Sequence, residues 1–332
     1  MLMAFVLACE VIIGKYKFTQ VNEVRTNLNW RELGNTCEIR LPKHVLTEDK
    51  IENTLDKVLK AGDPVSVKLW YTGYEAHEEF NGYVKRINPN IPTELECEDH
   101  VYFFRKTPIR KSWPETTLKE VVQYLVGEVN KKHPSAKITV SGKLPDVTLK
   151  PFIIETGCTA ATALQTIKEN YGLVSYFRGR ELYTGLAYGQ TFGDVRYSLA
   201  WNVIFHELKY RDEDDVLLKV KAIGIQKENT KVSVEVGDED GEQRTLHFYN
   251  VDKESELKKL AEEELKRLKF TGYEGDLTTF GYPYAEPLMV ADLRDPEYGE
   301  SRSGRYVIDS VKCEFGPYGW RREVELGVKL TV

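Results

Sequence analysis

Acidic side chains form the densest group of residues that could do chemistry in this 332-residue sequence. A strand-like run, residues 94–99, contains Glu94, Glu96, Glu98 and Asp99. Two carboxylates that flank a glycosidic bond can hydrolyse it, one as the acid and the other as base or nucleophile. Alternate side chains of a strand share a face, so the three glutamates would line one edge as solvated charges. A cell-wall glycosidase that uses these four residues is kept as an alternative function.

The other candidate motifs carry less weight. His206 and Glu207 are neighbours in a strand pattern, so their side chains would point to opposite faces. The loop 237–241 holds three acidic residues between two glycines, yet it lacks the spacing and the closing glutamate of a calcium loop. Nucleotide-binding, nucleophile-elbow and zinc-protease motifs are absent from the sequence. The sequence therefore predicts no catalytic, cofactor-binding or metal-binding residues, no cofactor, and a protein that is not an enzyme.

The five cysteines are far apart and never form a C-x-x-C pair: Cys9, Cys37, Cys97, Cys158 and Cys313. They predict neither a disulfide scaffold nor a zinc site, and they suit small buried thiols in a protein made in a reducing cytoplasm. Cys9 follows Val6-Leu7-Ala8, a loose match to the box before a lipidated cysteine. The N-terminal apolar run is too short to span a membrane, and no Lys or Arg precedes Lys15, so no membrane anchor is expected. A carbohydrate-binding surface lipoprotein anchored at Cys9 is kept as a second alternative.

Composition limits the class of protein. Hydrophobic residues make up 41% of the chain and charged residues 30%, which favours folded cores over disorder. The length suggests two or three domains. Acidic residues outnumber basic residues by 52 to 46, and sequence-specific binding of nucleic acid needs a surplus of positive charge. We therefore expect no recognition of nucleic-acid sequence.

Residues 1–105 read as strands around one helix. Thr47 is a suitable N-cap and Gly62 a suitable stop, which predicts a helix over residues 48–61. A hairpin with period-two alternation follows within residues 65–87. The helix is expected to bury an apolar stripe formed by Ile51, Leu55, Val58 and Leu59.

Residues 106–190 read as an α+β insert. Thr117 and Glu120 have the spacing of a capping box, which predicts a helix that continues through Val129. A second helix is predicted over residues 159–170, and a short hairpin follows it.

Residues 191–332 read again as strands with one charged helix. The helix is predicted over residues 252–269, and its apolar face carries Leu257, Leu260, Ala261 and Leu265. Alternating patterns predict strands on both sides of it, at 203–210, 216–224, 231–236, 243–249, 288–293, 304–311 and 322–332.

The first and third segments share a pattern of strands, an amphipathic helix and a hairpin. The second arm of the hairpin contains Gly82-Tyr83-Val84 in the first segment and Gly304-Arg305-Tyr306-Val307 in the third. Such self-similarity indicates an internal duplication. The predicted fold class is α+β and mostly β, with two similar tube-like β-barrel domains (1–105 and 191–332), each with one helix, separated by an α+β insert domain (106–190).

Stretches along most of the chain resemble the phage baseplate hub family. This family includes the late control protein D of contractile phages, the Mu-like tail hub and the N-terminal half of the VgrG spike proteins of type VI secretion. The order of the stretches carries the resemblance more than any one of them. Residues 62–71, 80–87 and 95–99 look like its first tube-like domain, 117–121 and 176–183 like its insert, and 275–281, 306–311 and 315–320 like its second tube-like domain.

The resemblance implies a structural baseplate hub subunit of a prophage contractile tail or a related injection machine. Such a hub joins a six-fold tail tube to a three-fold spike around a central channel, so a homotrimer is expected. The implied partners are the tail tube protein, the spike protein and other baseplate proteins, and DNA could pass through the channel. The implied location is the virion tail baseplate or a secretion-type particle, assembled from proteins made in the bacterial cytoplasm. The sequence stops at Val332 without a needle-like β-helix or lysozyme module, so a separate spike protein is expected.

Overall fold

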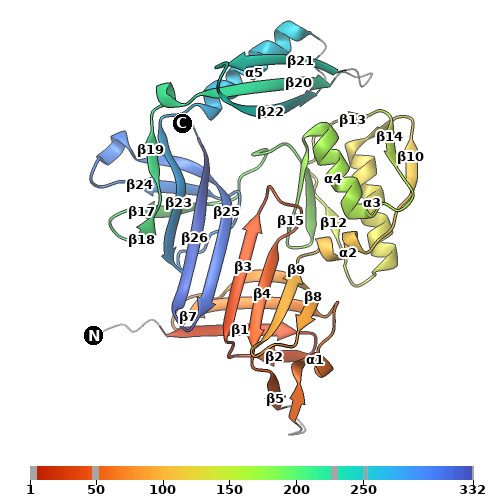
Figure 1. Cartoon of the computed structure of the whole chain (residues 1–332), viewed down its shortest axis with the longest axis vertical. Coiled ribbons are helices and arrows are strands. Elements are labelled where there is room, and N and C mark those ends of the chain that lie inside the picture. Colours follow the sequence, from red (N-terminus) through yellow and green to blue (C-terminus); the bar gives the residue numbers. More distant parts are fainter. Residues whose placement is uncertain (1–5, 47–51, 226–230, 250, 252, 331–332) are drawn as a thin grey trace.

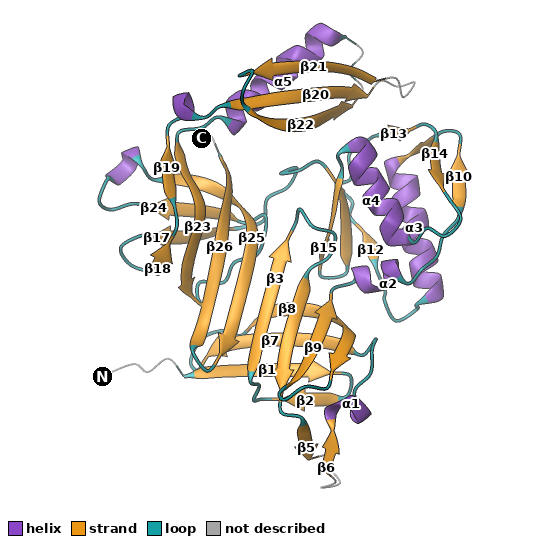
Figure 2. Ribbon diagram, in the orientation of Figure 1, coloured by secondary structure: helices purple, strands orange, loops and turns teal. Residues whose placement is uncertain are grey.

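One large sheet runs through the molecule, with two smaller groups of helices and strands beside it (Figures 1 and 2). The computed structural model describes residues 6–46, 52–225, 231–249, 251 and 253–330. Strands dominate this part of the chain, and the large sheet alone contains 14 of them. The fold class is α+β and mostly β, as the sequence predicts.

The first half of the large sheet, which we call the first unit, comes from residues 7–98. Its strands pair antiparallel in the order β3-β4-β9-β8-β7-β1-β2. Alternate side chains, such as those of Val11, Ile39 and Leu69, are fully buried in a shared core. The strands are β1 (Leu7–Ile13), β2 (Tyr16–Phe18), β3 (Glu23–Asn29), β4 (Thr36–Leu41), β7 (Pro64–Tyr71), β8 (His77–Asn88) and β9 (Thr93–Glu98).

The helix predicted over residues 48–61 is wrong. The structure has a two-stranded ribbon, β5 (His44–Leu46) and β6 (Glu52–Thr54), followed by a helix of only four residues, α1 (Leu55–Val58). The predicted cap, Thr47, lies outside the described residues.

The apolar stripe of that prediction is nevertheless largely buried. Leu55 and Leu59 lie in the core of the first unit, and Val58 packs against it. Ile51 lies outside the described residues. The apolar spacing therefore predicts burial correctly, but packing onto the sheet outweighs local helix propensity in setting the backbone.

The second half of the large sheet, the second unit, comes from residues 194–329. Its pairing order is β17-β24-β25-β26-β23, with β18 and β19 both on the far side of β23. Two single-turn 3₁₀ helices, Glu213–Asp215 and Gly299–Ser301, interrupt its loops. The strands are β17 (Asp194–Ser198), β18 (Val203–His206), β19 (Lys209–Arg211), β23 (Gly272–Phe280), β24 (Val290–Arg294), β25 (Gly304–Gly316) and β26 (Gly319–Lys329).

The two units have the same strand order. The order β1-β7-β8-β9-β4-β3 in the first unit corresponds to β17-β24-β25-β26-β23-β18/β19 in the second. β7 begins with Pro64 opposite Tyr83, and β24 begins with Val290 opposite Val307. The predicted duplication is confirmed in strand order. One direction differs, because β17 runs parallel to β24 whereas β1 runs antiparallel to β7.

The helix predicted over residues 252–269 is present as α5 (Glu254–Leu268), but it belongs to a separate subdomain (Figure 2). It packs on a three-stranded sheet of β20 (Leu218–Ile225), β21 (Lys231–Gly237) and β22 (Glu242–Tyr249). This subdomain lies between β19 and β23, whereas the equivalent strands β3 and β4 are joined by a short turn. The two helices expected from the sequence therefore do not occupy equivalent places in the two units.

The apolar face of α5 explains where the helix packs. Leu257 and Ala261 are fully buried against the subdomain sheet, while Leu260 and Leu265 are partly buried. An amphipathic helix covers the apolar sheet face that lies within its reach, and β20 and β21 supply that face here.

A single joint makes the two units one sheet. β25 pairs antiparallel with β3, from Ser310 opposite Asn29 to Phe315 opposite Val24. The β25–β26 hairpin also carries Phe315 and Trp320 into the core of the first unit. The core of one unit is therefore completed by side chains of the other.

The insert lies against the first unit and the joint (Figure 1). The predicted capping box is present, because the backbone amide of Glu120 donates to Thr117 Oγ1 (3.2 Å) and the amide of Thr117 donates to Glu120 Oε2 (3.1 Å). Both predicted helices and the hairpin are confirmed. The elements are α2 (Val101–Arg105), β10 (Lys111–Trp113), β11 (Thr116–Thr117), α3 (Leu118–Lys132), β12 (Thr139–Val140), β13 (Thr148–Leu149), β14 (Phe152–Ile154), α4 (Ala160–Tyr171), β15 (Val174–Arg178) and β16 (Glu181–Gly185).

A buried histidine lies between the first unit and the insert. His100 is 1% exposed, and neither of its ring nitrogens has a hydrogen-bond partner. Its ring packs edge-on to Tyr83 of β8 and against Phe177 of β15. Burial, with a smaller contribution from Arg180, lowers the pKa of His100 to about 4.

We expect this histidine to make folding stability depend on pH. Below its unfolded pKa of about 6.5, the unfolded chain binds a proton that the folded chain does not, so stability falls as pH drops towards 4. Relative to His100→Leu, the native chain should lose up to about 3 kcal/mol of unfolding free energy between pH 6.5 and 4. Denaturant titrations at several pH values measure this difference. Parallel profiles for the two chains would contradict it, and a replacement of the exposed His206 by Gln is the matched control.

Candidate functional surfaces

A buried ion pair ties the two units together. Arg322 of β26 and Glu79 of β8 are both fully buried, and two hydrogen bonds of 2.7 and 3.0 Å join the guanidinium to the carboxylate. The guanidinium also donates to the carbonyl oxygens of Gly281 and Ala285. A buried, bidentate and fully hydrogen-bonded pair holds two elements in one orientation.

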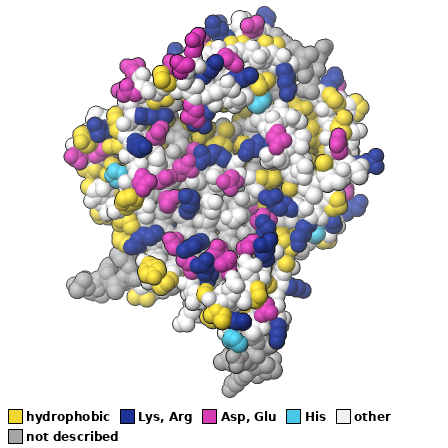
Figure 3. Space-filling view, viewed as in Figure 1, with side chains coloured by type: hydrophobic (Ala, Val, Ile, Leu, Met, Phe, Trp, Pro, Cys, Tyr) yellow, Lys and Arg dark blue, Asp and Glu magenta, His cyan; other side chains and the backbone are white. Residues whose placement is uncertain are grey.

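The large sheet presents a charged face across both units (Figure 3). At the outward positions of β3, β4, β9, β25 (310–314) and β26 (321–325), all of which are described, there is no apolar side chain. Acidic and basic residues alternate there and pair with one another across strands. The charged face includes Arg25, Glu38, Arg40, Glu94, Glu96, Lys312, Glu314, Arg321 and Glu323.

The three glutamates of the glycosidase alternative point to this charged face, as the strand pattern predicts, but the expectation that all three are solvated is wrong, because Glu98 is buried (4% exposed). They are ion-paired rather than placed across a cleft from one another. Each has a cationic partner: Arg40 for Glu94 (3.4 Å), Arg86 for Glu96 (3.6 Å) and Lys85 for Glu98 (2.8 Å).

Asp99 has a different environment from the glutamates. It is buried, and it accepts hydrogen bonds from the backbone amides of Asn35 (2.8 Å) and Val101 (2.9 Å). Burial raises the pKa of Asp99 to about 6. The carboxylate therefore orders the turn between β3 and β4, and the four acidic residues do not form one site.

Cys9 does not fit the lipoprotein alternative. It lies inside β1, is 5% exposed, and packs in the core of the first unit. Pairing between β1 and β7 already begins at Leu7 opposite Tyr71. A lipid on this sulfur would have no room in the folded unit.

The acidic loop 237–241 also has a structural role. Asp238 is ion-paired with Lys269 and accepts a hydrogen bond from the amide of Leu218 (2.9 Å). Among the described residues, no three His, Cys, Asp or Glu side chains come together as metal ligands could. Within the same ranges, no helix is long and apolar enough to cross a membrane.

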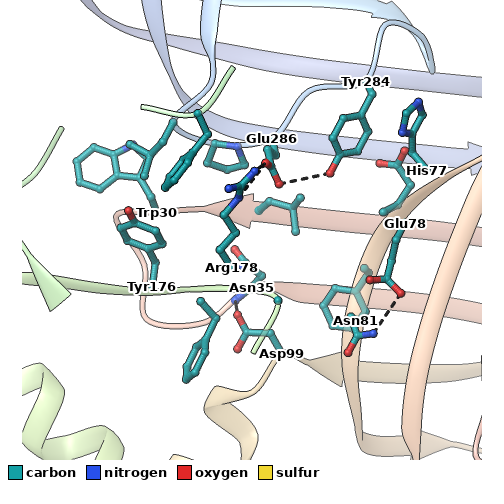
Figure 4. Close-up of a pocket in the computed structure, with 18 residues that line it drawn as sticks. Trp30, Asn35, His77, Glu78, Asn81, Asp99, Tyr176, Arg178, Tyr284 and Glu286 are labelled. Atoms are coloured by element: carbon teal, nitrogen blue, oxygen red, sulfur yellow. Dashed lines mark hydrogen bonds and ion pairs between the residues drawn. The ribbon is translucent and has the colours of Figure 1, made fainter. Parts of the chain in front are cut away.

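A cavity of about 410 Å³ lies where the two units and the insert meet (Figure 4). Arg178 of the insert is ion-paired with Glu286 of the second unit (2.6 Å), and Tyr284 donates a hydrogen bond to the same carboxylate. His77 of β8 stacks on Tyr284, with ring centroids 4.6 Å apart. These contacts fix the three parts against one another. Sequence reasoning misses the cavity because its residues come from separate segments.

Sequence reasoning also misses a set of exposed apolar side chains. Ile91, in the turn between β8 and β9, is 83% exposed. Trp201 and Phe205, around β18, are 86% and 58% exposed, and Ile204 lies between them. The place of Ile91 next to Pro92, in turn-forming sequence, is a local signal that could identify this residue.

Solved structures show which proteins share this fold. No protein-family model and no curated protein sequence matches the chain. A 43 kDa tail protein of prophage MuSo2 from Shewanella oneidensis is 15% identical, with a TM-score of 0.63, and the match covers 96% of this chain and 97% of that one. A tail protein from Neisseria meningitidis MC58 is also 15% identical, with a TM-score of 0.62 over 98% and 97% of the two chains.

A secretion protein shares the fold as well. The E. coli c3393 protein is described as a type VI secretion system component that is structurally similar to the T4 bacteriophage tail proteins gp27 and gp5. It is 7% identical, with a TM-score of 0.60, and the match covers 97% of this chain and 77% of that one. The resemblance inferred from the sequence is confirmed at the level of the fold: this chain has the fold shared by prophage tail proteins and a type VI secretion component.

Proposed function

We propose that the chain is a structural, non-enzymatic hub subunit of a contractile-tail injection machine, of phage or secretion type. The observation that carries the proposal is the pair of units with one strand order, joined edge to edge in a single sheet. Three such chains would present six like units, which suits a six-fold tube on one side and a three-fold spike on the other. The correspondence in shape with prophage tail proteins along nearly the whole chain supports the same role.

The charged face suits the wall of a channel. Over β3, β4, β9, β25 (310–314) and β26 (321–325), the charged face has no apolar side chain that could anchor a stable protein interface, because interface cores are built from aromatic and aliphatic side chains. Mixed charge keeps the surface hydrated, so a polymer could move along it without adhering. We therefore place the charged face towards the channel, and assign no catalytic residue, cofactor or metal to the protein.

The remaining assignments follow from this role. We propose tube-like domains at 1–105 and 191–332, the second interrupted by the β20–β22 subdomain, with an insert domain at 106–190. The tube protein, a separate spike protein and other baseplate proteins are the proposed partners, and the baseplate is the proposed location.

Copy number tests this function. Particles purified from the producing cells should contain three copies of the chain for every six copies of the tube protein in one ring. Quantitative mass spectrometry with isotope-labelled reference peptides measures the ratio, provided that the number of tube rings is counted by electron microscopy. Deletion of the gene should leave the cells without complete particles. Complete particles in the deletion strain, or six copies of the chain per particle, would contradict the proposal.

A further inference from the structure

The duplication allows each strand of the first unit to be compared with its counterpart in the second unit. Just before β25 meets β3, Ile308 makes two backbone hydrogen bonds, accepting from Leu288 (2.8 Å) and donating to Met289 (2.9 Å). Val84 of β8 makes the same two bonds with Gly62 (2.8 Å) and Asp63 (2.9 Å). β8 therefore reaches the corresponding point with the same geometry.

Beyond that point, β25 and β8 differ in their pairing. β25 continues along β3, beginning at Ser310. In β8, pairing with β7 ends at Tyr83, and residues 86–88 have β9 on one side and no described strand on the other. The end of β8 is therefore an edge whose counterpart in the second unit is occupied.

The counterpart of β3 is an edge as well. Val24 of β3 lies opposite Ile39, as His206 of β18 lies opposite Leu277. β3 has strands on both sides, β4 and β25. In the described chain, β18 and β19 pair with β23 alone, so the side that corresponds to the β25 side of β3 is open.

We propose that the end of β8 in one copy of this chain pairs antiparallel with β18–β19 of a second copy, as β25 pairs with β3 within one chain. Transferring the internal register places Arg86 opposite Arg211 and Asn88 opposite Lys209. The contact joins two different edges, so it is heterologous, and it builds a ring where the rotation between copies closes. Closure at three copies rests on the proposed hub function.

One exposed apolar side chain supports this pairing. In the internal joint, Phe315 lies opposite Val24 and packs into the neighbouring core. By the same register, Ile91 of one copy would lie opposite His206 of the second copy, as Phe315 lies opposite Val24. Ile91 is 83% exposed in the single chain, and the pairing would cover it. Phe205, the neighbour of His206 in β18, points to the opposite face of the sheet.

The proposed contact between copies places two arginines opposite each other, and each of them has an acidic partner. Arg86 is ion-paired with Glu96 (3.6 Å), and Arg211 with Glu274 (2.7 Å). Each arginine therefore brings a carboxylate to the joint, which offsets the repulsion between two like charges across the strands.

A cysteine pair tests the register. Directly opposite residues in an antiparallel pair lie about 5 Å apart at Cα, within disulfide range, whereas a shift of two residues exceeds it. Full-length chains with Asn88→Cys and Lys209→Cys are oxidised with oxidised glutathione, both as concentrated purified protein and in producing cells. We expect disulfide-linked dimers and trimers on non-reducing gels, with about tenfold more product than from the shifted control pair Asn88→Cys and Glu207→Cys.

Two outcomes would overturn the interface. One is no linked product at the predicted pair in either setting, and the other is equal product from the shifted pair. Ile91→Glu should abolish the linked product without unfolding the chain, while Tyr318→Glu, on another exposed turn, should not. Three copies per particle together with no product at this pair would leave the hub function intact and reject the interface alone.

Discussion

Replacing Glu79 with leucine is expected to lower the free energy of unfolding by about 3–5 kcal/mol, because it leaves the buried charge of Arg322 without a partner. Folded domains are stable by only about 5–15 kcal/mol, so this loss takes a large share of the total. Glu79→Gln keeps a hydrogen-bond acceptor and should lose less. Chemical denaturation of the purified chains measures the differences.

The matched control is an exposed ion pair on the same sheet. Lys312 and Glu323 are about half exposed, and Lys312→Ala should cost at most about 1 kcal/mol. Adding Arg322→Met to Glu79→Leu should recover part of the loss, because the unpaired charge is then removed. A cost for Glu79→Leu as small as that of Lys312→Ala would show that Arg322 is not buried as the structure places it.

Replacing Trp320 with alanine should cost a similar amount, about 3–5 kcal/mol, through a cavity in the core of the first unit. Trp320 is 2% exposed, and its Nε1–H donates to Cys313 Sγ (2.8 Å). The indole also packs directly over Gly281, where a Cβ atom would overlap the ring. Gly281→Ala should therefore destabilise the chain by overpacking rather than by a cavity.

The same hairpin supplies the control for the tryptophan. Tyr318, two residues away, is 94% exposed, and Tyr318→Ala should change stability by no more than about 0.5 kcal/mol. Thermal and denaturant unfolding of both variants test the contrast. If Trp320→Ala leaves the first unit as stable as Tyr318→Ala does, the two units do not share a core.

These contacts join the two units of the large sheet to each other. Arg322 and Trp320 belong to the second unit, yet Arg322 binds Glu79 of the first unit and Trp320 packs in the core of the first unit. The same principle, an edge or core of one unit completed by the next, underlies the proposed contact between copies.

Local patterns in the sequence were enough to predict much of the fold. Period-two alternation marks β7, β8 and β9, and the spacing of Thr117 and Glu120 marks the start of α3. Each of these signals depends on residues within a few positions of one another, because alternation and capping are properties of one strand or one helix end. The duplication was readable for the same reason, since each unit repeats the local pattern.

The sequence could not determine where contacts with distant elements would outweigh the local preference for helix or strand. Residues 52–58 have helical spacing, yet they form β6 and a four-residue helix. The charged helix α5 is correctly predicted, but only the structure shows that it covers its own three-stranded sheet. In both places a contact with a distant element outweighs a local preference.

By itself the sequence determined the fold class, the repeat of strands along the chain, and the charged character of the face that carries Glu94, Glu96 and Glu98. Only the tertiary structure decided that β3 joins β25, that Glu79 meets Arg322, and which edges remain open. The physical reason is the distance along the chain. Edge pairing and buried charge depend on residues more than two hundred positions apart, and no local pattern encodes such a meeting.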